Sequence, residues 1–158
     1  MPMRADCSRD DRDVIRPMRP DDMGAVTLVR TSVKENHLSV EGMAKRGITP
    51  QKIIADIGEG KLGAWVAEER GEIVAFSMAD KSNGQLFALF TKPGHERRGY
   101  GTALLAEAEA WLKSCGWREA CLSTEKESTA HRFYVRRGWR ATDDVPFAIE
   151  DVAMRKAL

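Results

Sequence analysis

The sequence predicts an α+β fold with a single mixed, mostly antiparallel central sheet flanked by helices. Three short runs of strand-like composition, 64–68, 73–78 and 85–91, follow one another with only turn-forming residues between them, which is typical of an antiparallel meander. A helical segment and a further strand-like run at 121–123 come next. This strand–helix–strand order requires a parallel pair of strands with a right-handed crossover, so the sheet must contain both orientations.

Length and composition indicate one globular domain. The chain has 158 residues, 42% of them hydrophobic, and its 25 Lys and Arg nearly balance its 24 Asp and Glu. A net charge of +1 argues against a dedicated nucleic-acid or membrane-surface protein, because a polyanion would not be attracted strongly. No apolar run approaches the roughly 20 residues that a membrane-spanning helix needs.

The first thirteen residues are rich in charge and lack the apolar core of a secretory signal. We therefore expect a disordered charged tail over residues 1–13, a single domain over residues 14–158 and a cytoplasmic protein. The cysteines form no C-x-x-C pair and have no histidines at zinc spacing, so neither a disulfide framework nor a metal site is expected. They are Cys7, Cys115 and Cys121.

An edge strand at 14–18 and two helices are predicted ahead of the meander. Residues 20–22 are typical of a helix start, with a proline followed by two acidic residues in the first turn. The second helix has Thr49 as its N-cap, Pro50 at its first position and Gly58 at its end. The apolar stripes expected to be buried are Met23, Val26, Val29 and Val33 in the first helix and Ile53, Ile54 and Ile57 in the second.

An amphipathic helix with clear periodicity follows Gly101. Its apolar residues recur on one face until Gly116, which supplies the left-handed residue that commonly ends a helix. Another helix is predicted over 129–137, stopped by the glycine that follows it. Strands near 139–141 and 148–154 complete the expected sheet.

Segment 91–102 joins a strand directly to the amphipathic helix. A helix N-terminus presents backbone N–H groups without helical partners and carries a partial positive charge. Gly99 and Gly101 would let a ligand approach the backbone, while Arg97 and Arg98 add positive charge. The pattern indicates a seat for a phosphate or pyrophosphate. The alternative is that the glycines only form a tight turn and the arginines are solvated.

Two common phosphate-binding loops do not fit these residues. A P-loop would end in Gly-Lys-Ser or Gly-Lys-Thr, which is absent. A dinucleotide-binding fingerprint would have a third glycine where Leu104 stands, and it would follow the first strand of a βαβ unit instead of a meander. Neither ATP nor a nicotinamide is therefore expected as cofactor.

Two motifs together resemble those of the GNAT superfamily of acyl-CoA-dependent N-acetyltransferases. The first, Arg/Gln-x-x-Gly-x-Gly/Ala, is matched at 96–101 by Glu-Arg-Arg-Gly-Tyr-Gly. The second, Ala-x-x-Phe/Leu-Tyr-x-x-x-Gly-Trp/Phe, is matched over 130–139. The resemblance extends from about Val14 to Met154, because the predicted order of elements is also the order found in the family.

The resemblance implies an acyltransferase that uses acetyl-CoA. Backbone groups at the end of the strand before the loop would hold the pantetheine arm, and amides of the loop would bind the pyrophosphate. Tyr134 takes the position of the general acid that protonates the leaving thiolate, a role that suits a phenol because it is neutral at about pH 7. The alternative for Tyr134 is a core aromatic packed with Phe133 and Ala130. The implied coenzyme-binding residues are Leu89, Phe90, Thr91, Arg97, Arg98, Gly99, Tyr100, Gly101 and Thr102.

Two positions depart from the family pattern. Glu96 stands where the family usually has Arg or Gln, and because that position acts through its backbone amide, coenzyme binding should survive with lower affinity. Glu127 stands where many members have an Asn that contacts the coenzyme, so that contact is not expected here. Ser128 or Thr129 is expected to cap the following helix instead.

Direct acyl transfer also needs a base, because the attacking amine must be neutral. Four residues are candidates: Glu35 and His37, in the segment 33–39 where the family binds its acceptor, and Asp80 and Glu125 near strand ends. Each also fits a solvated surface residue. The mixture of charge and amide in 33–39 indicates a small polar amine without identifying one.

We therefore expect an N-acetyltransferase that moves an acetyl group from acetyl-CoA to a primary amine of a small molecule or peptide. Transfer would be direct, in a ternary complex, with the carbonyl polarised by an amide near Phe90. The alternative is a non-catalytic acyl-CoA-binding sensor or interaction module. No metal, nucleic acid or membrane is expected as a partner, and a homodimer, which is frequent in the family, stays open.

Overall fold

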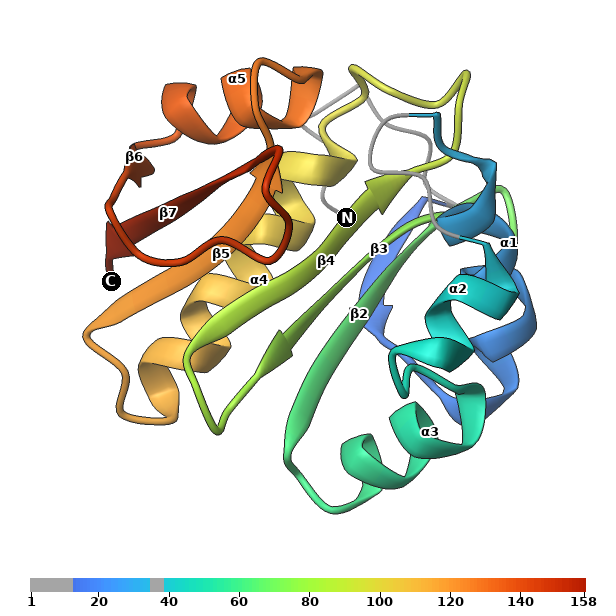
Figure 1. The fold of residues 1–158 in the computed structure, drawn as a ribbon. Helices are drawn as coiled ribbons and strands as arrows, with labels where there is room; N and C mark the ends of the chain where they lie inside the picture. The colour runs from blue at the N-terminus through green and yellow to red at the C-terminus, as the bar shows by residue number, and fades with distance from the viewer. Residues whose placement is uncertain (1–12, 35–38) are drawn as a thin grey trace, which may run out of the picture.

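The computed structural model describes residues 13–34 and 39–158. The described strands form one seven-stranded sheet in the order β1-β2-β3-β4-β5-β7-β6 (Figure 1). All neighbouring strands are antiparallel except β4 and β5, which are parallel, so the predicted mixed sheet is confirmed. The strands are β1 (Val14–Pro17), β2 (Leu62–Glu69), β3 (Glu72–Asp80), β4 (Gln85–Thr91), β5 (Glu119–Glu125), β6 (Arg140–Ala141) and β7 (Asp151–Ala157).

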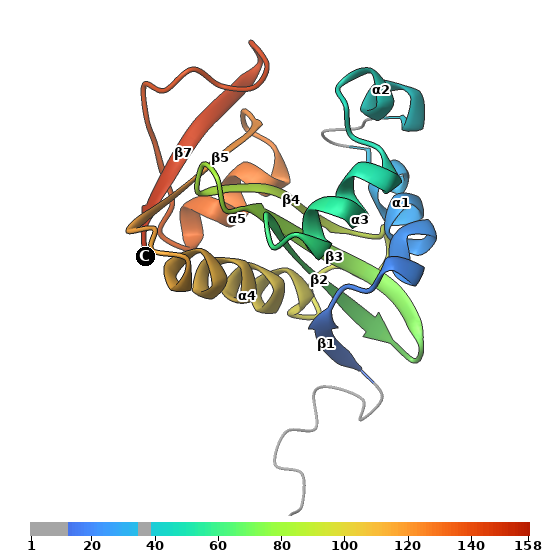
Figure 2. The same ribbon diagram turned by 90° about the horizontal axis from the view of Figure 1, so that it is seen from below.

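Helices cover both faces of the sheet. Figure 2 shows α4 on one face and α1 and α3 on the other. None of the helices in the described part of the chain has the length and apolar character needed to cross a membrane. The helices are a 3₁₀ turn, η1 (Pro20–Asp22), followed by α1 (Met23–Ser32), α2 (Val40–Lys45), α3 (Pro50–Gly58), α4 (Tyr100–Ser114) and α5 (Thr129–Arg136).

Each face of the sheet has its own hydrophobic core. On one face, α4 and α5 pack against the sheet through residues that include Leu104, Leu112 and Tyr134. On the other face, α1 and α3 pack through residues that include Val26 and Ile53. Burial of these apolar stripes is the main favourable contribution to the fold.

Predicted helix ends are confirmed where the capping chemistry is local. The Thr49 hydroxyl accepts a hydrogen bond from the Lys52 amide at 3.2 Å, as expected for an N-cap. Ser128, and not Thr129, caps α5 by accepting from the His131 amide at 3.0 Å. The glycine predicted to end α4, Gly116, has a φ of +100°, in the left-handed region.

Two expectations about the elements were wrong. The short helix α2 was not predicted, although the Ser39 hydroxyl caps it by accepting from the Gly42 amide. The last strand was expected to begin at Ala148, but it begins at Asp151. The reason is a turn in which the Asp151 amide donates to the Ala148 carbonyl, so the chain cannot yet run along β5.

The only parallel contact in the described sheet is very short. Gln85 and Cys121 are the one registered residue pair between β4 and β5. Just beyond it, Met78 and Ala79 of β3 face Ala88 and Leu86, which leaves Phe87 as the extra residue of a β-bulge. A bulge bends its strand. The C-terminal half of β4 therefore has an edge that β5 does not pair.

Candidate functional site

The loop between β4 and α4 has an unusual backbone. Gly94 and Gly99 have φ values of +95° and +86°, and Arg97, which has a side chain, has a φ of +65°. A non-glycine residue in this region costs about 1–2 kcal/mol, and such residues are frequent at functional sites. Glu96, the departure from the family pattern, holds the loop by accepting a hydrogen bond from the Gly94 amide at 2.8 Å.

The N-terminus of α4 presents free backbone donors. Gly99 is the N-cap and makes no side-chain capping bond, and the Ala103 amide is the first to donate to it, at 3.1 Å. Within the described part of the chain, the amides of residues 99–102 have no hydrogen-bond partner. Such amides, at the positive end of the helix dipole, form a ready anion site.

Glu69, at the end of β2, holds the β4–α4 loop in place through three hydrogen bonds. Its carboxylate accepts from His95 Nδ1 at 2.7 Å, from Arg98 at 2.6 Å and from the Tyr100 hydroxyl at 2.8 Å. The hydrogen bond from Tyr100 is the main reason why the pKa of Glu69 is below its ordinary value, and His95 and Arg98 act in the same direction. Sequence reasoning missed Glu69, because nothing near it in the sequence pairs it with a loop that begins more than 20 residues later.

Tyr100 serves this anchor with its side chain. The ring is buried, with 2% exposure, and its hydroxyl oxygen also lies 3.1 Å from Asp13 Oδ2, so that two carboxylates share the one phenolic proton. Burial is the main cause that raises the pKa of Tyr100, and the bond to Glu69 adds to it. Only the Tyr100 amide is therefore free to meet a ligand. Asp13, assigned to the charged tail, is part of the domain through this contact, whereas residues 1–12 lie outside the described residues.

The arginines near the α4 N-terminus differ in their partners. Arg97 is exposed and has no ion pair in the described structure, whereas Arg98 is committed to Glu69. Arg137, for which no role was predicted, stacks over the Phe133 ring at 3.7 Å. Its Nε and Nη2 donate to the Thr102 hydroxyl at 3.1 and 2.8 Å. The positive charge beside the free amides thus comes from Arg97 and Arg137.

The open edge of β4 has an alternating pattern. The Lys92 amide donates to the Val74 carbonyl at 2.7 Å, which sets the register of bonding between β3 and this end of β4. Because peptide groups of successive residues point to opposite sides in a strand, those of Phe90 are turned toward β3. The peptide groups of Leu89 and Thr91 therefore point to the unpaired edge. Of the three residues predicted here, these two are placed to meet a ligand through the backbone.

Tyr134 lies in the core under α4. It is 6% exposed and makes edge-to-face contacts with Phe133 at 5.4 Å and Trp139 at 5.8 Å. No hydrogen bond from its hydroxyl is found in the described structure. Burial raises the pKa of Tyr134, so the phenol keeps its proton near neutral pH. The residue is thus both a core aromatic and a neutral donor.

The four candidate bases lie in different parts of the chain, and two of them are described by the structure. Glu35 and His37 lie outside the described residues. Asp80 is not placed for the role, because its carboxylate accepts from the Ser82 amide and hydroxyl in the β3–β4 turn, at the end of the sheet away from the loop. Glu125 lies at the end of β5, opposite Asp151 of β7.

Asp151 is a carboxylate that sequence reasoning missed. It accepts from the Ser123 hydroxyl at 3.1 Å, and that hydroxyl accepts from the Phe147 amide at 2.9 Å. Burial is the main cause that raises the pKa of Asp151, with smaller contributions from the nearby Glu150 and Glu125. A carboxylate of raised pKa is better suited to accept a proton. No pattern marks it in the sequence, since it depends on how β7 pairs with β5.

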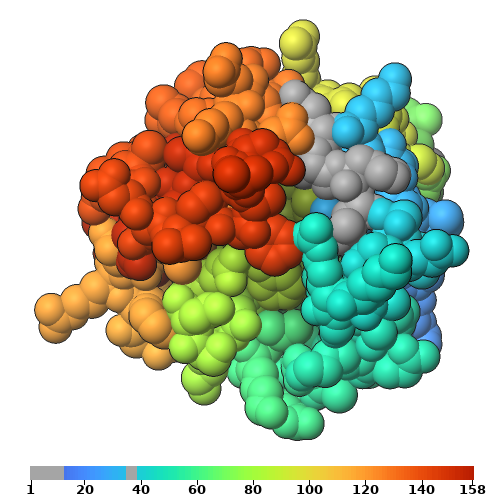
Figure 3. Space-filling view, viewed as in Figure 1, coloured from blue at the N-terminus to red at the C-terminus, as the bar shows by residue number. Residues whose placement is uncertain are grey.

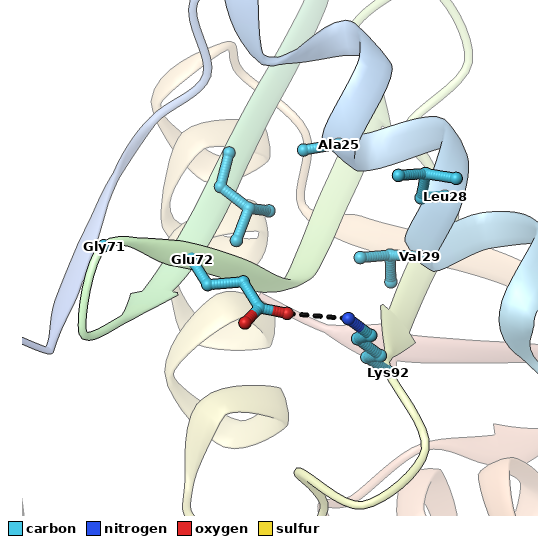
Figure 4. Close-up of a pocket in the computed structure, with 7 residues that line it drawn as sticks. Ala25, Leu28, Val29, Gly71, Glu72 and Lys92 are labelled. Atoms are coloured by element: carbon cyan, nitrogen blue, oxygen red, sulfur yellow. Dashed lines mark hydrogen bonds and ion pairs between the residues drawn. The ribbon is translucent and has the colours of Figure 1, made fainter.

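A pocket of about 370 Å³ lies elsewhere, between α1 and the β3–β4 pair, and is lined by residues that include Leu28, Val29 and Ile73. Figure 4 shows the ion pair between Glu72 and Lys92, 2.6 Å long, at its side. None of the predicted catalytic or coenzyme-binding residues lines this pocket. It therefore has no part in the candidate site.

Comparison of the chain with known proteins agrees with the geometry. Residues 61–141, about half of the chain, match the family model described as "Acetyltransferase (GNAT) domain". A search of curated protein sequences found no match.

Solved structures share the fold. PaiA N-acetyltransferase from Thermoplasma acidophilum, in complex with coenzyme A, has a TM-score of 0.76 at 20% identity, covering 92% of this chain and 99% of that one. Ribosomal-protein-alanine N-acetyltransferase from Brucella melitensis has a TM-score of 0.70 at 17% identity, with coverages of 92% and 99%. YncA from Salmonella typhimurium, solved with its cofactor acetyl-CoA, has a TM-score of 0.72 at 18% identity, with coverages of 94% and 95%. With the family model and the fold in agreement, the chain belongs to the GNAT acetyltransferase family.

Proposed function

We propose that this chain transfers an acetyl group from acetyl-CoA to a primary amine by direct attack within a ternary complex. One observation carries the proposal: four free amides at the α4 N-terminus, residues 99–102, lie next to the unpaired edge of β4. The first feature suits a diphosphate, and the second suits the amide-rich arm that follows it in coenzyme A. The coenzymes present in the PaiA and YncA structures support this assignment.

In this proposal each group has a separate task. The amides of 99–102 bind the pyrophosphate, and Arg97 and Arg137 add positive charge beside it. The free peptide groups of Leu89 and Thr91 pair with the pantetheine arm, and one of their amides polarises the thioester carbonyl. Glu69 contributes indirectly, because it holds the loop in the conformation that exposes these donors.

The chemistry needs one proton acceptor and one proton donor. The amine nitrogen forms a bond to the acetyl carbon as the carbon–sulfur bond breaks. Asp151 is the proposed base that takes the proton from the acceptor amine, directly or through a water molecule. Tyr134 gives its proton to the departing thiolate, in keeping with a buried phenol that stays neutral. No covalent acyl-enzyme is required.

A two-part experiment tests the proposal. Coenzyme A at about 100 times its dissociation constant should stabilise the folded protein by roughly 2.7 kcal/mol, measured as a thermal shift. A panel of amines with acetyl-CoA should then release free thiol above the rate of hydrolysis. Absence of the thermal shift would contradict coenzyme binding. A thermal shift without thiol release from any amine would favour the non-catalytic binding module.

A further inference from the structure

Arg30, in the last turn of α1, carries a charge that no described residue neutralises. Its Nη1 is buried and has no hydrogen-bond partner, and its Cζ lies 4.1 Å from the centre of the Phe90 ring. No ion pair to Arg30 is found in the described part of the chain. Arg16, by contrast, donates to Asp22 at 2.8 Å and to Glu68 at 2.6 Å. A buried cation without a partner is costly, so its retention needs an explanation.

A second cation lies close to the first. Arg46, at the C-cap of α2, places its Cζ 4.5 Å from the centre of the Phe147 ring. Burial, assisted by the charge of Arg46, lowers the pKa of Arg30 to about 10, and no carboxylate among the described residues opposes these effects. Two guanidinium groups therefore lie on the α1–α2 side of the site, and no carboxylate among the described residues forms an ion pair with either of them.

Both cations lie on the face where the acceptor would enter. Phe90 packs with the core of α1 and α3, on the face opposite α4, and its neighbours Leu89 and Thr91 present the open edge of β4. Figure 2 shows α2 and the segment before β7 projecting on this same side. The contact between Arg46 and Phe147 joins these two segments, which meet on the surface drawn in Figure 3.

The opposite wall has the opposite charge. Leu122 of β5 and Met154 of β7 are opposite each other and pack in the core of α4. Because side chains alternate along a strand, Ser123 and Asp151 point to the other face, which is that of Arg30. The site thus has guanidinium groups on the α1–α2 side and a carboxylate on the β5–β7 side.

We propose that Arg30, assisted by Arg46, binds a carboxylate of the acceptor, so that the acceptor is an amino-acid-like amine whose ammonium group faces Asp151. This inference rests on the proposed acetyl transfer and names its substrate class. The planar guanidinium matches a carboxylate with two parallel hydrogen bonds, and its unused Nη1 supplies one of the donors. The bound carboxylate would neutralise the charge of Arg30, which has no ion-pair partner among the described residues.

Matched acceptors test the inference on the whole chain. Free amino acids should be acetylated with kcat/KM roughly 10- to 100-fold above their carboxamides, as expected for losing a charge-assisted hydrogen bond. The same order should hold for binding to the coenzyme A-saturated protein, measured by thermal shift. Equal values for amino acids and carboxamides, or binding of neither, would overturn it. A preference for amines that carry a phosphate instead of a carboxylate would overturn it too.

Substitution of Arg30 gives an independent readout. Arg30→Met keeps the apolar stem on Phe90 but removes the charge, so KM for amino acids should rise while carboxamides are unaffected. Arg30→Lys should recover part of the loss, and Arg46→Met should cause a smaller one. Without acceptor, Arg30→Met should melt at the same or a higher temperature, because a costly charge is gone. Arg118→Met, an exposed arginine at the far end of the sheet, is the matched control.

The outcomes separate this inference from the proposed function. If Arg30→Met lowers the melting temperature and leaves the KM values unchanged, Arg30 is a packing residue and the inference is wrong, while acetyl transfer stands. If Arg30→Met weakens coenzyme A binding, the cation belongs to the coenzyme site and the inference is again wrong. If the unmodified chain does not bind coenzyme A, the proposed function itself fails.

Discussion

The arginines on the two faces of the sheet differ in their partners. On the α4 face, the loop arginine Arg98 is held by Glu69, and Arg137 is fixed by Thr102 and Phe133. On the α1 face, Arg30 and Arg46 lie over aromatic rings, and neither has an ion pair within residues 13–34 and 39–158. The arginines of the α4 face are held in place by protein groups, which suits a preformed coenzyme site. We propose that those of the α1 face are paired by the carboxylate of the acceptor. Changes on the α4 face should therefore act on the coenzyme, and changes on the α1 face on the acceptor.

The largest effect is expected at Tyr134, because its substitution would remove the proposed proton donor. Tyr134→Phe should lower kcat by about 100- to 10,000-fold, because the proton donor is lost while the ring stays packed. Coenzyme A affinity and the KM of the acceptor should be unchanged, as measured by thermal shift and steady-state kinetics. An equal loss of turnover and coenzyme affinity would show that Tyr134 acts by packing.

Gly101→Glu should lower the affinity for coenzyme A by roughly 100-fold, measured as loss of the thermal shift with coenzyme A. The new carboxylate enters the first turn of α4, where it opposes a diphosphate but favours the helix dipole, so the fold should survive. The added Cβ would lie 3.4 Å from the Phe133 ring, a contact that is close but ordinary.

Gly24→Glu is the control for this change, because nothing lies within 4 Å of a Cβ added there. It also places a new acid in the first turn of a helix, α1. Full coenzyme affinity in Gly101→Glu would mean that the diphosphate binds elsewhere.

Glu69→Gln tests whether the bonds that hold the β4–α4 loop contribute to stability and to coenzyme binding. Loss of its ion pair with Arg98 and weakening of its hydrogen bond with His95 should destabilise the fold by about 1–3 kcal/mol in denaturant unfolding and weaken coenzyme binding. The pKa of Glu69 is lowered in the folded protein, so its contribution is present above the ordinary value of 4.5 and is lost as pH falls through the lowered pKa. The stability difference between the two proteins should therefore shrink in acid. A difference that persists or grows there would contradict the anchoring role.

The smallest effects separate two neighbouring arginines. Arg97→Gln should lower coenzyme A affinity a few-fold, more at low salt, and leave stability unchanged, because Arg97 has no ion pair among the described residues. Arg98→Gln should lower stability by less than about 1 kcal/mol and alter affinity only through the loop. Isothermal titration and unfolding of both variants measure this. Equal changes in affinity and stability for the two variants would contradict the different roles assigned to Arg97 and Arg98.

The candidate coenzyme site could be proposed from the sequence because its signals are local. Gly99 and Gly101 stand at a strand-to-helix junction, and Tyr134 lies in a motif of fixed spacing, so neighbours in the sequence carry the pattern. The helix caps at Thr49 and Ser128 are local for the same reason. Such features need no knowledge of tertiary packing.

The remainder depends on contacts between distant segments. Glu69 meets Tyr100 across 31 positions, and Ser123 meets Asp151 across 28. No sequence pattern marks Arg30, and only the fold places its guanidinium group over the Phe90 ring. The short helix α2 lacks an apolar stripe long enough to be recognised. These residues could not be assigned without three-dimensional structure.

The backbone amides at the start of α4 are proposed to bind the diphosphate of the coenzyme, and the assignment of function depends on this contact. Titration of ¹⁵N-labelled protein with coenzyme A, followed by the amide resonances of residues 99–102, tests it directly. We expect these four resonances to move furthest and to become protected from hydrogen exchange. Resonances that stay in place while others shift on binding would contradict it.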